Sequence, residues 1–260
     1  MVEAPSRRDR VRAATVEEIK QTARGLLVAD GPEAVSLRAI GRAMGMTAPA
    51  LYRYFGSRED LVKHVCADIF IEIAGDIHAA IEQASEATGG DMTAKMIAAC
   101  RAFRSWALAH GPEFGLLFGT PLPGLETMHD DVVDECAQTF SNEFLGLFYE
   151  LWTRHPFPVP ADEEIEPGLV AQLRQYRDGL GVDLPVGAVL TFLRCWVRLY
   201  GMVSLEVFGH LEFALDDPST MFEYTLAELA ELIGLDYRPT RGPAPGAERS
   251  ALPDGASPLR

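Results

Sequence analysis

The sequence predicts an all-α protein in which three short N-terminal helices are followed by a bundle of longer ones. Apolar residues recur every three or four positions along the chain, which is the repeat of one helix face. No segment shows the alternation of apolar and polar residues that is typical of a half-buried strand. Clusters of Gly and Pro separate the periodic segments and mark the connecting loops.

A first helix is expected over residues 15–29, where Thr15 followed by Glu18 makes a capping-box pattern ahead of an apolar face. Residues 1–14 are polar and contain four closely spaced arginines, so we expect a flexible basic arm there. This arm has two interpretations. Its arginines can contact a nucleic-acid backbone, or the segment is simply a frayed and solvated chain end.

Two short helices joined by a tight turn are predicted between Ser36 and Phe55. Ser36 can cap the first helix by accepting a hydrogen bond from a free backbone amide. Gly45 falls where the chain must turn, a position that favours a residue without Cβ. Thr47 can cap the second helix, and Pro49 falls in its first turn, where the missing N–H is tolerated.

The apolar spacing separates an inner face from an outer face in this pair of helices. The inner face holds Leu37, Ile40, Met44, Leu51 and Phe55. The outer face and its margins hold Thr47, Ala48, Ala50, Tyr52, Arg53 and Tyr54. This pattern is typical of a helix-turn-helix, whose second helix enters the DNA major groove. Spacing alone is also compatible with a helical hairpin that binds nothing.

A long helix is expected from Arg58 to about Ser85, capped by Ser57. The acidic pair Glu59 and Asp60 suits the positive end of its dipole. An apolar residue at every fourth position forms a continuous stripe: Leu61, Val65, Ile69, Ile73, Ile77 and Ile81. One rigid element would therefore join the N-terminal helices to the rest of the chain.

The remaining helices are expected over residues 91–109, 113–118, 128–155, 168–180, 183–210 and 217–234. The segment 183–210 is apolar on more than one face, which predicts burial on two sides. One side would face its own bundle and the other a partner subunit. Residues 237–260 are rich in Pro, Gly and Ala, so we expect a disordered tail.

The charge of the chain is divided unevenly along its length. The net charge of −15 argues at first against contact with a nucleic acid. Residues 1–65 hold 11 Lys and Arg against 8 Asp and Glu, whereas the remainder holds 12 against 30. A mildly basic N-terminal part can bind phosphates while the acidic remainder is repelled from the duplex.

The chain carries no recognisable catalytic or metal-binding pattern. Its six His and four Cys are scattered without ligand spacing, and no phosphate-binding Gly loop or nucleophile elbow occurs. No apolar run approaches the roughly 20 residues that span a bilayer. We therefore expect no enzyme activity, no cofactor, no metal site and no membrane segment, and a reducing cytoplasm as the location.

Aromatic residues are frequent on the inner faces of the later helices. Apolar cavities lined by aromatic side chains are the usual sites for small molecules, although such residues at helical spacing are also ordinary core. The candidates for a pocket are Phe103, Trp106, Phe114, Phe118, Phe144, Phe148, Trp152, Trp196 and Tyr200. The sequence does not separate pocket from core among them.

Residues 15–63 resemble the DNA-binding domain of the tetracycline-repressor (TetR) family of transcriptional regulators. The resemblance rests on the turn at Gly45, the run P-A-L-Y-R-Y-F and the spacing from A-D-G through S-L-R-A-I to G-S-R-E-D-L. The later run W-V-R-L-Y-G-M-V-S-L-E-V-F-G-H-L resembles the effector domain of a Trp–Gly-containing (WHG-type) subgroup, over residues 185–234. The resemblance implies a homeodomain-like three-helix domain at 15–63 and a helical ligand-binding and dimerisation domain at 64–236.

This resemblance also implies a function. The protein would be a homodimer, paired through helices near 185–210 and 218–234, that binds a palindromic DNA operator. It would act as a repressor released by a small-molecule effector, in the bacterial cytoplasm and at the nucleoid when bound to DNA. By correspondence, Thr47, Ala48, Pro49, Ala50 and Tyr52 approach bases or the groove wall; Arg38, Tyr54, Arg58 and Lys63 hold phosphates; and Arg53 can do either.

Two alternatives stay open at this point. The protein could be a member of the family that activates transcription or acts without a ligand. It could also be a small-molecule binding protein whose DNA-binding part no longer functions. The effector, the operator and the regulated genes are not given by the sequence.

Overall fold

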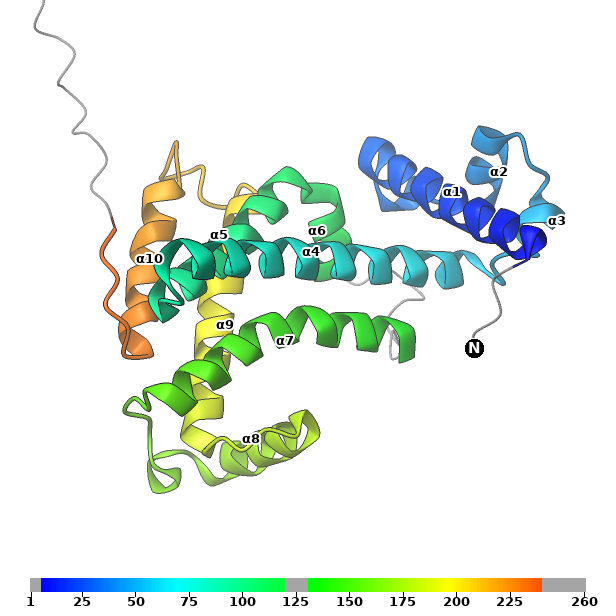
Figure 1. The fold of residues 1–260 in the computed structure, drawn as a ribbon. Helices are drawn as coiled ribbons and strands as arrows, with labels where there is room; N and C mark the ends of the chain where they lie inside the picture. Colours follow the sequence, from blue (N-terminus) through cyan, green and yellow to red (C-terminus); the bar gives the residue numbers. More distant parts are fainter. Residues whose placement is uncertain (1–5, 120–130, 240–260) are drawn as a thin grey trace, which may run out of the picture.

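The computed structural model describes residues 6–119 and 131–239, and in these ranges it contains helices and no strand. The predicted all-α class is therefore confirmed. The expected start of a helix at residue 128 and nearly all of the expected tail lie outside the described residues. We call α1 to α3 with the first turns of α4 the head, and the remaining helices the bundle (Figure 1).

The head consists of α1 (Arg7–Asp30), a 3-10 turn (Pro32–Ala34), α2 (Leu37–Met44) and α3 (Ala48–Leu51). Ser36 caps α2 by accepting a hydrogen bond from the Ala39 amide at 3.2 Å. Gly45 has a φ of 66°, in the left-handed region that favours glycine, and it turns the chain toward α3. These features were predicted from the sequence.

The start of α1 differs from the prediction of a flexible arm over residues 1–14. Residues 7–14 form the first two turns of α1, because Ser6 accepts from the Asp9 amide and the Asp9 carboxylate accepts from the Ser6 amide, both at 3.2 Å. Thr15, the cap expected from the sequence, lies inside the helix and donates to the Val11 carbonyl. The arginines of this segment are thus held on a helix.

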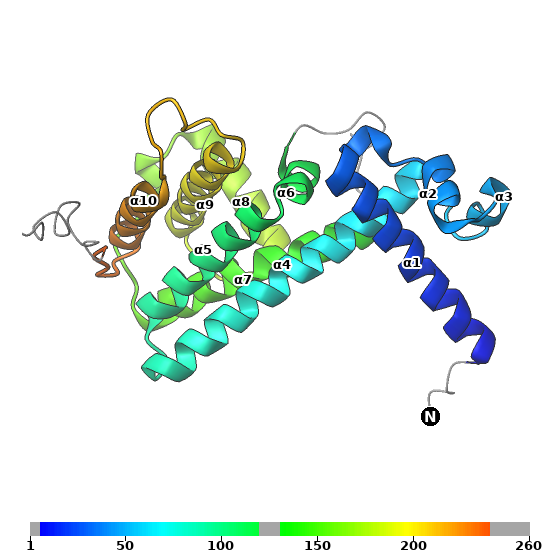
Figure 2. The ribbon, with the colours of Figure 1, turned by 90° about the horizontal axis from the view of Figure 1, so that it is seen from above.

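Helix α4 (Arg58–Thr88) runs from the head through the bundle as a single element (Figures 1 and 2). Ser57 caps it by accepting from the Asp60 amide at 3.0 Å. All six residues of the predicted apolar stripe are at most 5% exposed. One helix therefore joins the two parts, as predicted.

The bundle adds α5 (Met92–Ala109), α6 (Gly111–Phe118), α7 (Asp131–Arg154), α8 (Pro167–Leu180), α9 (Val186–Val207) and α10 (Ser219–Leu232), with a 3-10 turn at Asp162–Glu164. Helix α4 packs along α5 and α7, while α9 packs against α5, α8 and α10. Figure 2 shows α5 between α4 and the pair α9 and α10. A continuous core joins Ile19 of the head to Phe103 and Phe222 of the bundle.

Among the described helices, α9 is the one long and apolar enough to cross a membrane by composition, with a mean hydropathy of 1.4. The sequence predicted no such apolar run. A core helix of a soluble protein meets the same criterion, and α9 packs against three other helices. The helix is therefore weak support for a membrane segment.

Candidate functional site

The outer surface of α2 and α3 is built on a close contact between these two helices. The Met46 amide donates to the Gly41 carbonyl at 2.8 Å. A Cβ on Gly41 would lie 2.9 Å from the Met46 carbonyl oxygen and 3.3 Å from Leu51 Cδ1. Glycine is therefore required for α3 to lie this close to α2, a role that was not predicted from the sequence.

Most of the residues predicted to contact DNA lie on the surface of the head. Leu51 and Phe55 are 0% and 2% exposed, which turns the neighbouring side chains outward. Tyr52 is 57% exposed although it is a large aromatic residue. Arg38, Thr47, Pro49 and Arg53 are exposed, and Ala48, Ala50, Tyr54 and Lys63 are half-buried. Helix α3 is shorter than expected, so Tyr52 to Tyr54 stand on the turn that follows it.

Arg58, predicted as a phosphate ligand, has a structural role in the head. Its guanidinium donates to the Val35 carbonyl at 2.6 Å and to the Pro32 carbonyl at 2.8 Å. These bonds hold the 3-10 turn after α1 against the start of α4. Arg58 therefore braces the head from inside, a role that requires the folded path of the chain and left no signal in the local sequence.

Arg12 of α1 supports the turn that follows α3. Its guanidinium donates to the Arg53 carbonyl at 3.2 Å and lies over the Tyr54 ring, 5.2 Å from the centroid. A cation over an aromatic face is attracted by the ring quadrupole. The segment that was expected to be a flexible arm thus contacts the turn after α3, at Arg53 and Tyr54.

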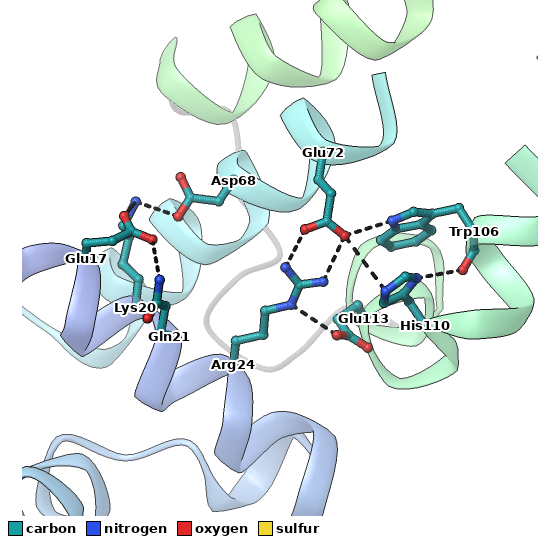
Figure 3. Close-up of polar contacts among 9 residues, drawn as sticks. All are labelled: Glu17, Lys20, Gln21, Arg24, Asp68, Glu72, Trp106, His110 and Glu113. Carbon is teal, nitrogen blue, oxygen red and sulfur yellow. Dashed lines mark hydrogen bonds and ion pairs between the residues drawn. The ribbon is translucent and has the colours of Figure 1, made fainter. Parts of the chain in front are cut away.

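Arg24 joins the head to the bundle (Figure 3). From α1 it donates to both carboxylate oxygens of Glu72 on α4, at 2.5 and 3.0 Å, and to Glu113 on α6 at 3.0 Å. The hydrogen bonds to Glu72 raise the pKa of Arg24 and lower that of Glu72. Paired geometry of this kind gives strong, directional hydrogen bonds. We call Arg24, Glu72 and Glu113 the junction.

Helix α5 reaches the junction through Trp106 (Figure 3). The indole N–H of Trp106 donates to Glu72 at 2.9 Å. The His110 ring stacks on the indole with centroids 4.7 Å apart, and its Nε2 lies 3.9 Å from Glu72. Trp106, predicted as a pocket residue, is instead 2% exposed and part of this network.

Three of the predicted pocket aromatics border one cavity in the described part of the chain. Phe144, Phe148 and Trp196 border an apolar cavity of about 50 Å³ between α5, α7, α9 and α10. Phe103 and Phe114 are fully buried in the core, and the Tyr200 hydroxyl donates to the Phe118 carbonyl at 2.6 Å. Trp152 packs edge-on against Phe157. Among the described residues, no group of His, Cys, Asp and Glu is placed to hold a metal ion.

Comparison with known proteins identifies the family. A model described as "Bacterial regulatory proteins, tetR family" matches residues 13–65, and one described as "Tetracyclin repressor-like, C-terminal domain" matches residues 96–229. The chain belongs to the tetracycline-repressor family. It is therefore a transcriptional regulator of the helix-turn-helix class, and this is not a family of enzymes. Membership of the Trp–Gly-containing subgroup stays a prediction.

Relatives of this TetR-family chain agree with the assignment. The HTH-type transcriptional regulators Rv1816 of Mycobacterium tuberculosis and Mb1846 of Mycobacterium bovis are each 27% identical over 208 residues, covering 79% of this chain and 86% of their own. The putative regulatory protein SCO4313, whose crystal structure is known, is 29% identical in sequence and superposes with a TM-score of 0.68. The match covers 88% of this chain and 100% of SCO4313. The fatty acid degradation regulator FadR of Bacillus halodurans shares the fold, with 13% identity and a TM-score of 0.52. That match covers 89% of this chain and 95% of FadR.

Proposed function

We propose that this TetR-family regulator is a homodimeric repressor that binds a palindromic operator and is released by a small-molecule effector. The observation that carries the proposal is the outer surface of α2 and α3. There Thr47, Tyr52 and Arg53 are exposed together over a buried apolar support. Such a regulator works in the bacterial cytoplasm, on the DNA.

The chemistry of this surface suits the major groove. Arg53 can donate to guanine or to a phosphate. Thr47 makes no capping hydrogen bond, so its hydroxyl can serve a base or a phosphate. The methyl group of Ala48 can only contact a thymine methyl or fill space. Specificity then depends on the flanking residues and on DNA shape.

Exposed apolar residues on α9 and α10 support a homodimer. Val197 and Leu205 of α9 are 66% and 42% exposed, and Met221 and Tyr224 of α10 are 49% and 57% exposed. Large exposed apolar surfaces usually mark an interaction site. Pairing two copies here would present two heads to successive major grooves, about 34–36 Å apart.

Release by an effector needs a connection from the bundle to the head, and α5 can supply it. Near its start, Met96 and Cys100 of this helix border the apolar cavity. Near its end, Trp106 donates to Glu72, which holds Arg24 of α1. A shift of α5 would therefore disturb the junction and change the position of the heads. The effector can shift occupancy only by its differential affinity for the two conformations.

DNA binding is tested by selecting genomic fragments on the protein and titrating a labelled selected fragment. We expect Tyr52→Ala to weaken binding at least tenfold, because it removes a large exposed side chain from the groove surface. Tyr149→Ala is the matched control, since Tyr149 is 39% exposed on α7 in the bundle. Equal affinity of both variants and the wild type would reject the DNA-binding surface.

The alternatives are separated by a reporter gene placed behind the selected fragment. Repression predicts that expression rises when the regulator is deleted. An activator would give the opposite change, and a protein with a non-functional head would give none.

A further inference from the structure

The cavity between α5, α7, α9 and α10 has an unusually uniform lining. Apart from apolar side chains it is bordered only by the thiols of Cys100 and Cys195. Burial raises the pKa of Cys100 to about 12 and that of Cys195 to about 11, so both thiols stay neutral. Trp196 turns no polar atom toward the cavity, and no charged side chain borders it within the described part of the chain.

This lining decides which ligands the cavity can accept. A charged group placed here would lose its hydration without gaining a partner, which costs several kcal/mol or more. An uncharged apolar group loses nothing comparable and gains from burial, at about 25 cal/mol per Å².

The size of the cavity adds a second restriction. Its volume is about 50 Å³, and a second hollow of about 70 Å³ lies on the other side of Phe144, Phe192 and Trp196. These three side chains form a shared wall between the two spaces. Rotation of the wall would join the two spaces and add the hydroxyls of Ser141 and Tyr176, which border the second hollow. The joined space still favours a compact ring or a short alkyl group over an extended molecule.

We propose that this cavity is the effector site and that it takes a compact, uncharged, apolar ligand. Calling this ligand an effector rests on the proposed function. Binding would act on α9 and α10, which carry the exposed apolar surface, and on α5, which reaches the junction. The ligand would thus be sensed at the two places that determine the spacing of the heads.

The test uses two probes of similar shape that differ in charge, fluorobenzene and 4-fluorobenzoate, observed by ¹⁹F NMR on the full chain. We expect the fluorobenzene resonance to shift and broaden with added protein and the 4-fluorobenzoate resonance to stay unchanged. Failure of fluorobenzene to bind, or equal binding of 4-fluorobenzoate, would overturn the proposal. DNA is absent from this measurement, so its outcome is independent of whether the head binds an operator.

Filling the cavity locates the binding. Ala230 borders the cavity on α10, so Ala230→Leu should weaken fluorobenzene binding at least tenfold. Ala227→Leu on the same helix is the matched control, because Ala227 does not border the cavity. Cys195→Leu fills the cavity from α9 and serves if Ala230→Leu does not fold. Unchanged binding in a folded cavity-filling variant would place the probe elsewhere and overturn the proposal.

Discussion

At the scale of single residues, the connection between head and bundle depends on Arg24. It is the partner of Glu113, a carboxylate that is only 4% exposed. A buried charge without its partner is far less stable than the pair. The junction is therefore a place where one side chain affects both parts of the molecule.

Replacing Arg24 tests this dependence. We expect Arg24→Met to lower the free energy of unfolding by about 1–3 kcal/mol, because the Glu113 carboxylate loses its donor while buried. The double variant Arg24→Met with Glu113→Gln should recover part of the loss, since the unpaired charge is gone. Urea unfolding measures both. As a control, Arg174→Met breaks an exposed pair with Asp162, for which about 0–1 kcal/mol is expected.

The junction also makes stability depend on pH. The hydrogen bonds from Arg24, helped by the Trp106 indole, lower the pKa of Glu72 from its ordinary value of 4.5. A carboxylate with a lowered pKa stabilises the fold above its ordinary pKa, and this contribution is lost as the pH falls through the lowered value. We expect Glu72→Gln to flatten the decline of unfolding free energy below about pH 4.5. Equal slopes for Glu72→Gln and the wild type would contradict this reading.

Residue roles were predictable from the sequence where they depend on local spacing. The caps Ser36 and Ser57 and the inward pair Leu51 and Phe55 follow from neighbours a few positions away, and the structure has them as predicted. The role of Arg58 depends on carbonyls 23 and 26 positions earlier in the chain. The junction spans three helices. Contacts of that separation have no periodic signature.

At the scale of elements, the first two turns of α1 were the main error. Ser6 and Asp9 form a capping box, a local signal that the prediction of a flexible arm over residues 1–14 did not include. We expect Ser6→Ala to speed amide exchange over residues 7–14, by about fivefold if the cap contributes about 1 kcal/mol. Thr15→Ala is the matched control at the other possible cap and should leave exchange in residues 7–14 unchanged. The reverse result would mean that the helix begins at Thr15 and that residues 1–14 are a flexible arm.

The close approach of α2 and α3 gives a second test at this scale. Gly41→Ala places a Cβ 2.9 Å from the Met46 carbonyl, so α3 must move. We expect a loss of about 1–3 kcal/mol in unfolding free energy together with weaker operator binding. Gly25→Ala on α1 meets no atom within 4 Å and should instead stabilise the helix by about 0.5–1 kcal/mol. If both variants lost stability, the loss in Gly41→Ala would not be caused by its close contact with Met46.

At the scale of the whole molecule, the sequence predicted the division into a basic head and an acidic bundle joined by one long helix. These features were predictable because net charge and apolar periodicity are properties of long segments and do not depend on single contacts. The pocket was not predictable in the same way. Phe103 and Phe144 have the same spacing signal, yet one is plain core and the other borders the cavity. Only the packing of four helices separates them.

The central claim, that two heads act together on one operator, is tested most directly by the mass of the complex. Analytical ultracentrifugation of a selected operator fragment with excess protein should give two chains per fragment. Val197→Glu, at the most exposed apolar position of α9, should separate the subunits and weaken operator binding at least tenfold. Val132→Glu is the control, 45% exposed on α7, and should retain the two-chain complex. One chain per fragment in the wild type, or full affinity in a monomeric Val197→Glu, would contradict the account.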